Sequence, residues 1–340
     1  MQRLIRRPVK FPLGAVYLAA ASVVFGVAFF AERMAGAAER GPPEVARYPE
    51  RAITYIVPWP AGGRSDAYAR ILQPHFEKEL GSPFVVVNRA GGVGVVGATA
   101  VQRAAPDGYT LGQWTGALFL QQFTTVPPLE WKKSTGIAGL VRTSMLLSVN
   151  KGRPWKTLKD FVNFVQANPG KVRLATSGPG ATDSIYFHAF LRAVGGGKVT
   201  IVPYGGDAPA ATALARGEGD VAFIPLAGVI AFRDDLRFLA VASDKRMAPL
   251  PDIPTMIEMG VNYKASAQDA MIGPAGLHPE IVRKLEGTVR KVLSKKEVEE
   301  QLGKIFIEPS FLNGKELQAY VVEWNPRWEA LVTELGLRKK

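Results

Sequence analysis

The stretch VPWPAGGRSDAYAR, from Val57 to Arg70, decides how the rest of this sequence is interpreted. An apolar, β-rich run at residues 52–59 predicts a strand that leads into the pair Gly62-Gly63. Apolar residues at helical spacing then predict a helix over residues 65–80. The start of a helix carries free N–H groups and a partial positive charge. This strand–loop–helix unit therefore favours a carboxylate or a phosphate as its ligand.

The same design, a strand followed by a glycine-rich loop, occurs three times. The three loops are Ala61-Gly62-Gly63, Ser177-Gly178-Pro179-Gly180 and Tyr204-Gly205-Gly206. Ligands of α/β sheets bind beyond the carboxyl ends of the strands, and glycine lets the backbone approach them closely. Ser65 or Asp66 is expected to cap the first of the helices that follow. Three such loops on a basic protein favour an anion site over three unrelated tight turns.

The rest of the chain alternates short apolar runs with helical stretches, which predicts an α/β fold with a largely parallel sheet. Further strands are predicted at residues 84–87, 110–114, 146–150, 172–176, 198–203, 219–225 and 236–243. Amphipathic helices are predicted at residues 155–167, 279–293 and 315–335.

The N-terminus is set apart from the folded part. Basic residues precede residues 11–31, which carry no charge, and Ala35-Gly36-Ala37 offers a small-residue cleavage site. Residues 1–37 are therefore expected to be a signal peptide or an uncleaved membrane anchor, because the apolar run is long enough to span a bilayer. Residues 38–47 are expected to be a linker. Both alternatives predict export of the remaining chain.

The composition excludes several chemistries. The 340 residues include no cysteine, which rules out disulfides, thiolate metal sites and cysteine nucleophiles. The formal net charge of +12 falls to +8 without residues 1–37, because that segment holds five cations and one anion. A basic exported protein suits an anionic solute, an anionic surface or nucleic acid. The chain lacks a nucleic-acid recognition motif, so no nucleic acid is expected as a partner.

Signatures of cofactor binding and catalysis are weak. GVGVVG at residues 92–97 matches the dinucleotide fingerprint, but it does not directly follow a strand, so a flexible loop is predicted there. ATSGP at residues 175–179 lacks the first glycine of a nucleophile elbow. His75, His188 and His278 have no metal-ligand spacing. We therefore expect no catalysis, no cofactor and no metal.

Five blocks of sequence, taken in order, resemble one protein family. They are YPERAITYIVPWPAGGRSDAYAR (48–70), NRAGGVGVVGA (88–98), APDGYTL (105–111), VPYGGDAPAATALARGEGDVAF (202–223) and LPDIPTMIEMG (250–260). The chain is similar, from about Tyr48 to its C-terminus, to the Bug-type periplasmic solute-binding receptors of tripartite tricarboxylate transporters.

The resemblance implies a two-domain periplasmic binding protein of type II, a Venus flytrap, with mixed, largely parallel sheets and a ligand cleft between the domains. Residues 48–148 with 270–340 would form domain 1, and residues 149–269 would form domain 2. Such a receptor captures a small carboxylate and delivers it to the inner-membrane permease subunits of a tripartite transporter. It is expected to be monomeric and to have no catalytic activity.

The resemblance also implies that backbone groups of two loops hold the ligand carboxylate between the domains. With help from the third loop, the expected ligand-binding residues are Pro58, Trp59, Ala61, Gly62, Gly63, Ser65, Asp66, Thr115, Ser177, Gly178, Gly180, Ala181, Thr182, Tyr204 and Gly205.

The sequence departs from the family pattern at two positions that bear on the ligand. Arg64-Ser65 replaces a Gly-Thr pair, and Ile224 stands where many relatives carry an aspartate. Arg64 adds a cation to the first loop, and Ile224 takes the place of a polar side chain. Together these departures predict a different ligand, either more apolar or more acidic.

The sequence leaves the ligand and the partner open. Dicarboxylates, tricarboxylates, amino acids, aromatic acids and nicotinate-type molecules are all compatible with recognition by the backbone. A sensor that hands its closed state to a membrane signalling partner is an alternative to a transport receptor. An enzyme on the same fold is a third hypothesis.

Overall fold

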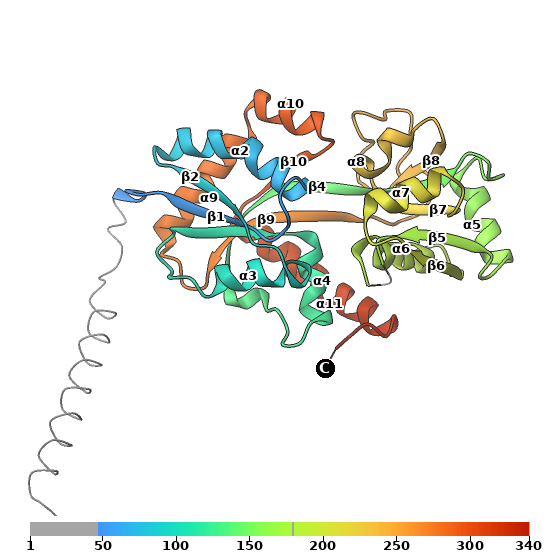
Figure 1. The fold of residues 1–340 in the computed structure, drawn as a ribbon, viewed down its shortest axis with the longest axis horizontal. Coiled ribbons are helices and arrows are strands. Elements are labelled where there is room, and N and C mark those ends of the chain that lie inside the picture. The colour runs from blue at the N-terminus through green and yellow to red at the C-terminus, as the bar shows by residue number, and fades with distance from the viewer. Residues whose placement is uncertain (1–46, 179, 340) are drawn as a thin grey trace, which may run out of the picture. The chain divides into compact units, whose positions relative to one another are not determined.

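The computed structural model describes residues 47–178 and 180–339, and the chain from residue 49 onward forms one compact unit (Figure 1). The predicted signal peptide or anchor, residues 1–37, lies outside the described residues, as does the linker except for Arg47. Within the described part, no helix combines the length and the apolar composition needed to cross a bilayer.

One part of the mixed sheet is built around three parallel strands. Its strands are β1 (Ile53–Val57), β2 (Phe84–Asn88), β3 (Thr110–Trp114), β4 (Ser134–Asn150), β9 (Ser266–Pro274) and β10 (Glu308–Leu312). β1 pairs in parallel with β2 and β3, whereas β9 is antiparallel to β3 and β4, and β10 is antiparallel to β4.

Helices cover both faces of this part of the sheet (Figure 1). They are α2 (Arg64–Leu80), α9 (Pro279–Leu293) and α10 (Lys296–Lys304) on one face, and α3 (Val95–Gln102), α4 (Gly116–Thr124) and α11 (Gly314–Glu334) on the other.

The second part of the sheet has β5 at its centre. Its strands are β5 (Val172–Thr176), β6 (Val199–Pro203), β7 (Val221–Pro225) and β8 (Leu236–Val241). β5 pairs in parallel with β6 and β7, while β7 and β8 pair antiparallel with the C-terminal half of β4. The helices around it are α5 (Leu158–Ala167), α6 (Thr182–Ala193), α7 (Asp207–Ala215) and the short α8 (Leu226–Val229).

The alternation of side chains along β7 explains how these helices are distributed. Val221 and Phe223 belong to a core cluster that contains residues of α5 and α6. Ala222 and Ile224 belong to a second cluster that contains residues of α7 and α8. Because successive side chains of a strand point to opposite faces, the strand is buried on both sides. This is why β7 is a continuous apolar run in the sequence.

β4 and β9 connect the two parts of the sheet (Figure 1). β4 pairs with β9 up to Ser144 and pairs with β7 and β8 from Met145 onward. Three backbone hydrogen bonds lock this crossing: Met145 N–H donates to Ala265 O at 2.9 Å, Ala265 N–H to Ala242 O at 3.0 Å, and Ala242 N–H to Met145 O at 2.9 Å. The chain therefore passes between the two parts through a narrow ladder of strands.

The predicted α/β fold with a mixed sheet is confirmed, and several helix bounds agree closely. The sheet is less parallel than expected: four of the described strand pairs are parallel and five are antiparallel, because β4 is antiparallel to all four of its partners and β9 is antiparallel to β3. The predicted helix over residues 279–293 is α9, whose apolar face is buried and whose N-cap is His278. α5 begins three residues later than predicted, at Leu158, because Thr157 and Asp160 form a capping box.

Two local predictions were wrong. The N-cap of α2 is Gly63 and forms no side-chain cap within the described residues, so neither Ser65 nor Asp66 caps the helix. The segment at residues 92–97 is not a flexible loop: Gly92–Gly94 form a 3₁₀ turn and α3 begins at Val95. The reason is packing, because α3 lies so close to the end of β1 that a Cβ atom on Gly97 would lie 2.7 Å from Pro58 Cα.

Two helical glycines provide a matched test of this packing. Gly97→Ala is expected to destabilise the protein by about 1–3 kcal/mol, although alanine favours a helix, because the added methyl group meets backbone atoms. Gly287→Ala in α9 meets nothing within 4 Å and should stabilise the protein by up to about 1 kcal/mol. Urea unfolding of both variants measures the difference. The same sign of effect in both variants would contradict the close approach at Gly97.

Candidate ligand-binding site

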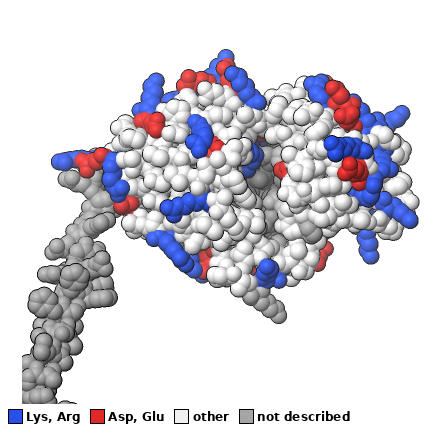
Figure 2. Space-filling model, in the orientation of Figure 1, with Lys and Arg blue, Asp and Glu red and all other residues white. Residues whose placement is uncertain are grey.

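A cleft of about 1140 Å³ opens at the carboxyl ends of β1, β3, β5 and β6. Its wall comes from both parts of the sheet, and Figure 2 shows it as a hollow with a basic patch inside. The carboxyl edge of parallel strands is where α/β folds bind their ligands. This cleft is therefore the candidate site.

Twelve of the fifteen residues predicted to bind the ligand line this cleft. They are Trp59, Ala61, Gly62, Gly63, Ser65, Thr115, Ser177, Gly178, Gly180, Ala181, Thr182 and Gly205. The structure thus brings together three loops that are far apart in the sequence. Contact of these residues with a ligand stays a prediction.

The other three predicted residues are not part of the cleft wall that the described residues form. Pro58 packs against α3 at Gly97. Tyr204 packs against the core cluster beneath α7 and α8. Asp66 is 4% exposed and lies behind the first loop. Their contribution to the site is to support the loops that line it.

Asp66 organises the first loop from behind. Its carboxylate accepts hydrogen bonds from Gly62 N–H at 2.8 Å, from Arg70 Nε at 3.0 Å and from Asn88 Nδ2 at 3.0 Å. Burial by itself would raise the pKa of Asp66, but these hydrogen bonds lower it below its ordinary value. Gly62 was expected among the residues whose backbone holds the ligand, but its amide is used within the loop.

Four helix N-termini converge on the cleft. The N-caps of α2, α4, α6 and α7 all line it, and none forms a side-chain cap in the described part of the chain; they are Gly63, Thr115, Ala181 and Gly206. Of the helices whose N-caps lie outside this cleft wall, α5, α9 and α11 form side-chain caps, whereas α3 and α10 do not among the described residues. The first amides of a helix have no partner within the helix. The cleft is therefore surrounded by N–H donors and by the positive ends of helix dipoles.

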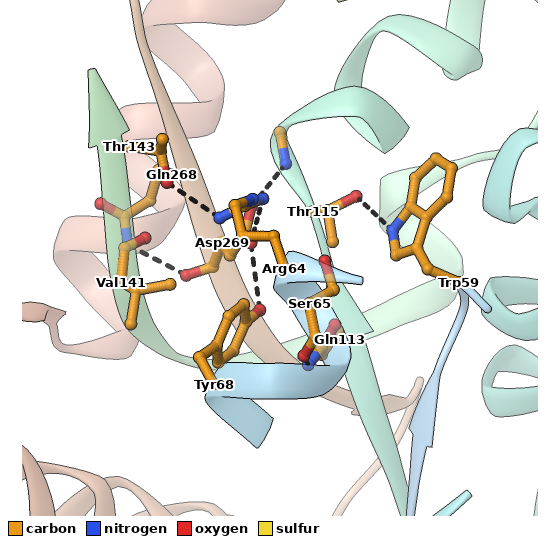
Figure 3. Close-up of polar contacts among 11 residues, drawn as sticks. Trp59, Arg64, Ser65, Tyr68, Gln113, Thr115, Val141, Thr143, Gln268 and Asp269 are labelled. Atoms are coloured by element: carbon orange, nitrogen blue, oxygen red, sulfur yellow. Dashed lines mark hydrogen bonds and ion pairs between the residues drawn. The ribbon is translucent and has the colours of Figure 1, made fainter. Parts of the chain in front are cut away.

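A buried carboxylate holds the wall formed by α2 and α4 together (Figure 3). Asp269 of β9 has no exposed side-chain surface, and it accepts hydrogen bonds from Arg64 Nη2 at 2.8 Å, Tyr68 Oη at 3.0 Å and Gly116 N–H at 2.9 Å. The second guanidinium nitrogen of Arg64, Nη1, donates to Thr143 Oγ1 of β4 at 2.8 Å. The start of α2, the start of α4 and two strands thus share one charged network.

This network keeps its donors protonated. Burial would lower the pKa of Arg64, but the attraction of Asp269 and Tyr68 raises it above its ordinary value. Burial, and then the charge of Asp269, raises the pKa of the Tyr68 hydroxyl well above its usual range. Both groups therefore remain hydrogen-bond donors to Asp269 at any physiological pH.

The two departures from the family pattern have different positions. Arg64 lines the cleft, with 29% of its side chain exposed. Ile224 is fully buried in the core cluster beneath α7 and α8, and the next residue, Pro225, lines the cleft instead. The expectation that Ile224 alters the polar surface offered to the ligand is therefore wrong, because the side chain at this position faces the core.

Sequence reasoning missed several residues of the cleft wall. Thr143 and Met145 come from the crossing of β4, Ala267 comes from β9, and Leu337 and Lys339 come from the C-terminal segment. No local motif marks these positions. Thr143, Met145 and Ala267 reach the cleft through the pairing of distant strands, and Leu337 and Lys339 through the packing of the C-terminal segment. The C-terminal segment is placed by a backbone hydrogen bond from Lys339 N–H to Phe123 O at 3.1 Å.

Two aspartates in the cleft wall were also missed, although a signal was present. Asp183 and Asp207 each lie in the first turn of a helix that follows a glycine-rich loop, as Asp66 does. Asp183 accepts hydrogen bonds from Thr176 Oγ1 at 2.6 Å and Ser177 N–H at 2.8 Å. Burial raises the pKa of Asp183 despite these bonds. Asp183 thus fixes the second loop as Asp66 fixes the first.

The described residues hold no group of three or more His, Asp or Glu side chains placed to bind a metal. The three histidines also lie outside the cleft wall that these residues form. The arrangement suits non-covalent binding of an anion through backbone amides, with Trp59 held at the wall by a hydrogen bond from its Nε1 to Thr115 Oγ1 at 3.3 Å.

Comparison with known proteins agrees with this architecture. Residues 68–337 match the model of the tripartite tricarboxylate transporter family receptor. Protein BugT of Bordetella pertussis is 30% identical over 86% of this chain and 92% of its own length.

Solved structures show the same fold. Periplasmic binding protein BugD is 28% identical, with a TM-score of 0.69 over 86% of this chain and all of that protein. MatC of Rhodopseudomonas palustris, solved with bound malate, is 28% identical, with a TM-score of 0.68 over 84% of this chain and all of that protein.

Replacing Arg64 tests the charged network. Arg64→Ala is expected to lower the free energy of unfolding by about 3 kcal/mol, because the buried Asp269 carboxylate loses its cation. In the control, Arg283→Ala removes a surface ion pair with Glu280 and should cost less than about 1 kcal/mol. Urea unfolding measures both. The double variant Arg64→Ala/Asp269→Asn should recover part of the loss, and equal losses in the two single variants would argue against the network.

Proposed function

Because the chain belongs to the tripartite tricarboxylate transporter receptor family, we propose that it captures a small carboxylate in the cleft and delivers it to the permease subunits of such a transporter. The protein acts in the periplasm, as a monomer, and carries out no catalysis. BugD, which is similar over most of this chain, is a periplasmic binding protein, which supports this location.

One observation carries the proposal: the N-termini of α2, α4, α6 and α7 line one cleft, and their N-cap residues form no side-chain cap within the described residues. The first amide of α4 already donates to Asp269, so the amides available to a ligand are mainly those at the starts of α2, α6 and α7. Unpaired amides there need an acceptor, and a carboxylate supplies it together with a charge that the helix dipoles favour. The malate found in MatC supports a carboxylate as the ligand class.

The first loop is the proposed contact for the ligand carboxylate. Gly63, Arg64 and Ser65 line the cleft at the start of α2, where the backbone amides have no helical partner. The loop is already held in place by Asp66, so a ligand does not have to order it on binding. A preorganised loop of this kind spends little of the binding energy on conformational entropy.

We also propose that the protein closes around its ligand as two domains, residues 48–148 with 270–340 and residues 149–269. The crossing of β4 at Ser144 and Met145 and the start of β9 at Ser266 lie within a few residues of these bounds, which supports them. The cleft wall includes Met145 and Ala267 from the same crossing. A hinge at these strands would let ligand contact favour the closed form that the permease recognises.

A ligand screen tests the proposal. The full-length protein in mild detergent is mixed with mono-, di- and tricarboxylates and amino acids, with the matching amides as neutral controls, and thermal unfolding is recorded. A carboxylate at 100 times its Kd should add about 2.7 kcal/mol of stability. Stabilisation by neutral solutes alone would contradict the carboxylate site.

A matched pair of glycine variants locates the ligand. Gly178 lines the cleft and has open space around its Cβ position, so Gly178→Trp fills the cleft without disturbing the core. Gly303 in α10 also has open space and lies outside the cleft wall of the described residues. Gly178→Trp should abolish the stabilisation by the carboxylate, whereas Gly303→Trp should leave it unchanged. An unchanged response in both variants would place the ligand elsewhere.

A further inference from the structure

The two sides of the cleft carry opposite charges. The charged residues that line it are Arg64 and Lys339 on the side of α2 and α4, and Asp183 and Asp207 on the side of α6 and α7. In Figure 2 a basic patch lies in the hollow and a small acidic patch lies across from it. A ligand in this cleft therefore meets a cationic wall and an anionic wall at the same time.

The cationic wall is built to stay in place. The Arg64 guanidinium is held from behind by Asp269 at 2.8 Å and by Thr143 at 2.8 Å. A guanidinium has five N–H donors in a planar fork, so these two contacts leave further donors for the cleft. The unpaired amides at the start of α2 lie beside it. This wall suits the carboxylate of a ligand.

The anionic wall depends on Asp207, because Asp183 is buried and already used by its own loop. Asp207 is exposed, and its Oδ1 accepts one hydrogen bond, from Ser177 Oγ at 2.7 Å. No Lys, Arg or His among residues 47–178 and 180–339 lies within ion-pair distance of it. Asp207 is close enough to Arg64 to contribute to the raised pKa of that guanidinium. The Asp207 carboxylate thus faces the cleft with no cation of its own.

We propose that the ligand is a zwitterion, an amino carboxylate whose carboxylate binds on the Arg64 side and whose protonated amine binds Asp207. This inference rests on the proposed function and names the substrate class within it. A second carboxylate in this position would meet the like charge of Asp207, which disfavours dicarboxylates and tricarboxylates. An ammonium group supplies the cation that Asp207 lacks and donates to its free oxygen.

The rest of the cleft wall indicates what the uncharged part of the ligand is. It includes Trp59, Val93, Met145 and Pro225, which offer no charged partner to a side chain. Apolar lining of this kind favours an apolar or aromatic body. The proposed ligand is therefore an amino acid with an apolar side chain or an amino acid of similar size with a separated amine.

Calorimetric titration of the full-length protein in mild detergent tests the inference. The zwitterions are phenylalanine, leucine and aminocaproate. Each is compared with the acid that lacks the amine (hydrocinnamate, isocaproate and caproate) and with the amine that lacks the carboxylate (phenethylamine, isoamylamine and amylamine). Malate and adipate are the diacids. At least one zwitterion should bind about tenfold or more tightly than both of its partners and than the diacids, as expected for a hydrogen-bonded charge.

Variants assign the preference to Asp207. Asp207→Asn should weaken binding of the zwitterion by about tenfold or more. Binding of the acid without the amine should stay unchanged or become tighter. Asp207→Glu keeps the charge and should keep the preference. Asp234→Asn is the control, because Asp234 is exposed outside the cleft wall and undergoes the same charge change. Circular dichroism of each variant confirms folding.

The outcomes separate this inference from the function on which it rests. Tighter binding of diacids or of the acids without amines would overturn the zwitterion and leave the carboxylate receptor standing. Zwitterion binding that Asp207→Asn does not change would overturn the role of Asp207 and the inference with it. If no carboxylate of any series binds, both the inference and the proposed function fail.

Discussion

Asp269 carries a fully buried carboxylate into the middle of the sheet, where a charge without compensation would be costly. Arg64 and Tyr68 from α2 and the first amide of α4 compensate it together. Arg64 also reaches Thr143 on β4, so two helices and two strands depend on one charge. This interaction sets where α2 and α4 begin relative to the sheet, and the ends of these helices form one wall of the cleft.

Three internal carboxylates accept backbone amides at a loop or at the start of a helix. Asp269 occupies the start of α4, Asp66 accepts the amide of Gly62, and Asp183 accepts the amide of Ser177. These internal carboxylates make the loops rigid. The starts of α2, α6 and α7, whose N-caps form no side-chain cap in the described part of the chain, line the same cleft. Amides bonded to an internal carboxylate therefore hold the structure, whereas the amides at the uncapped helix starts of the cleft are available to a solute.

The features that could be predicted from the sequence are local ones. The apolar spacing predicts α9, which buries one face, and the continuous apolar run predicts β7, which is buried on both faces. Of β4, the sequence predicts only the last five residues, 146–150. Its first part, from Ser134, contains small and polar residues, and it becomes a strand because β9 and β10 pair with it. Pairing between distant segments leaves no periodic signal in the strand itself.

By itself, the sequence determined the α/β class, the three glycine-rich loops at strand ends and the family to which they point, since these depend on neighbouring residues and on short motifs. The tertiary structure decided which loop amides are already used and which charges face the cleft. Arg64 shows why: its partner Asp269 lies 205 positions away. Hydrogen bonds and ion pairs act over a few ångströms, so only the folded chain determines which of its charges come within that distance.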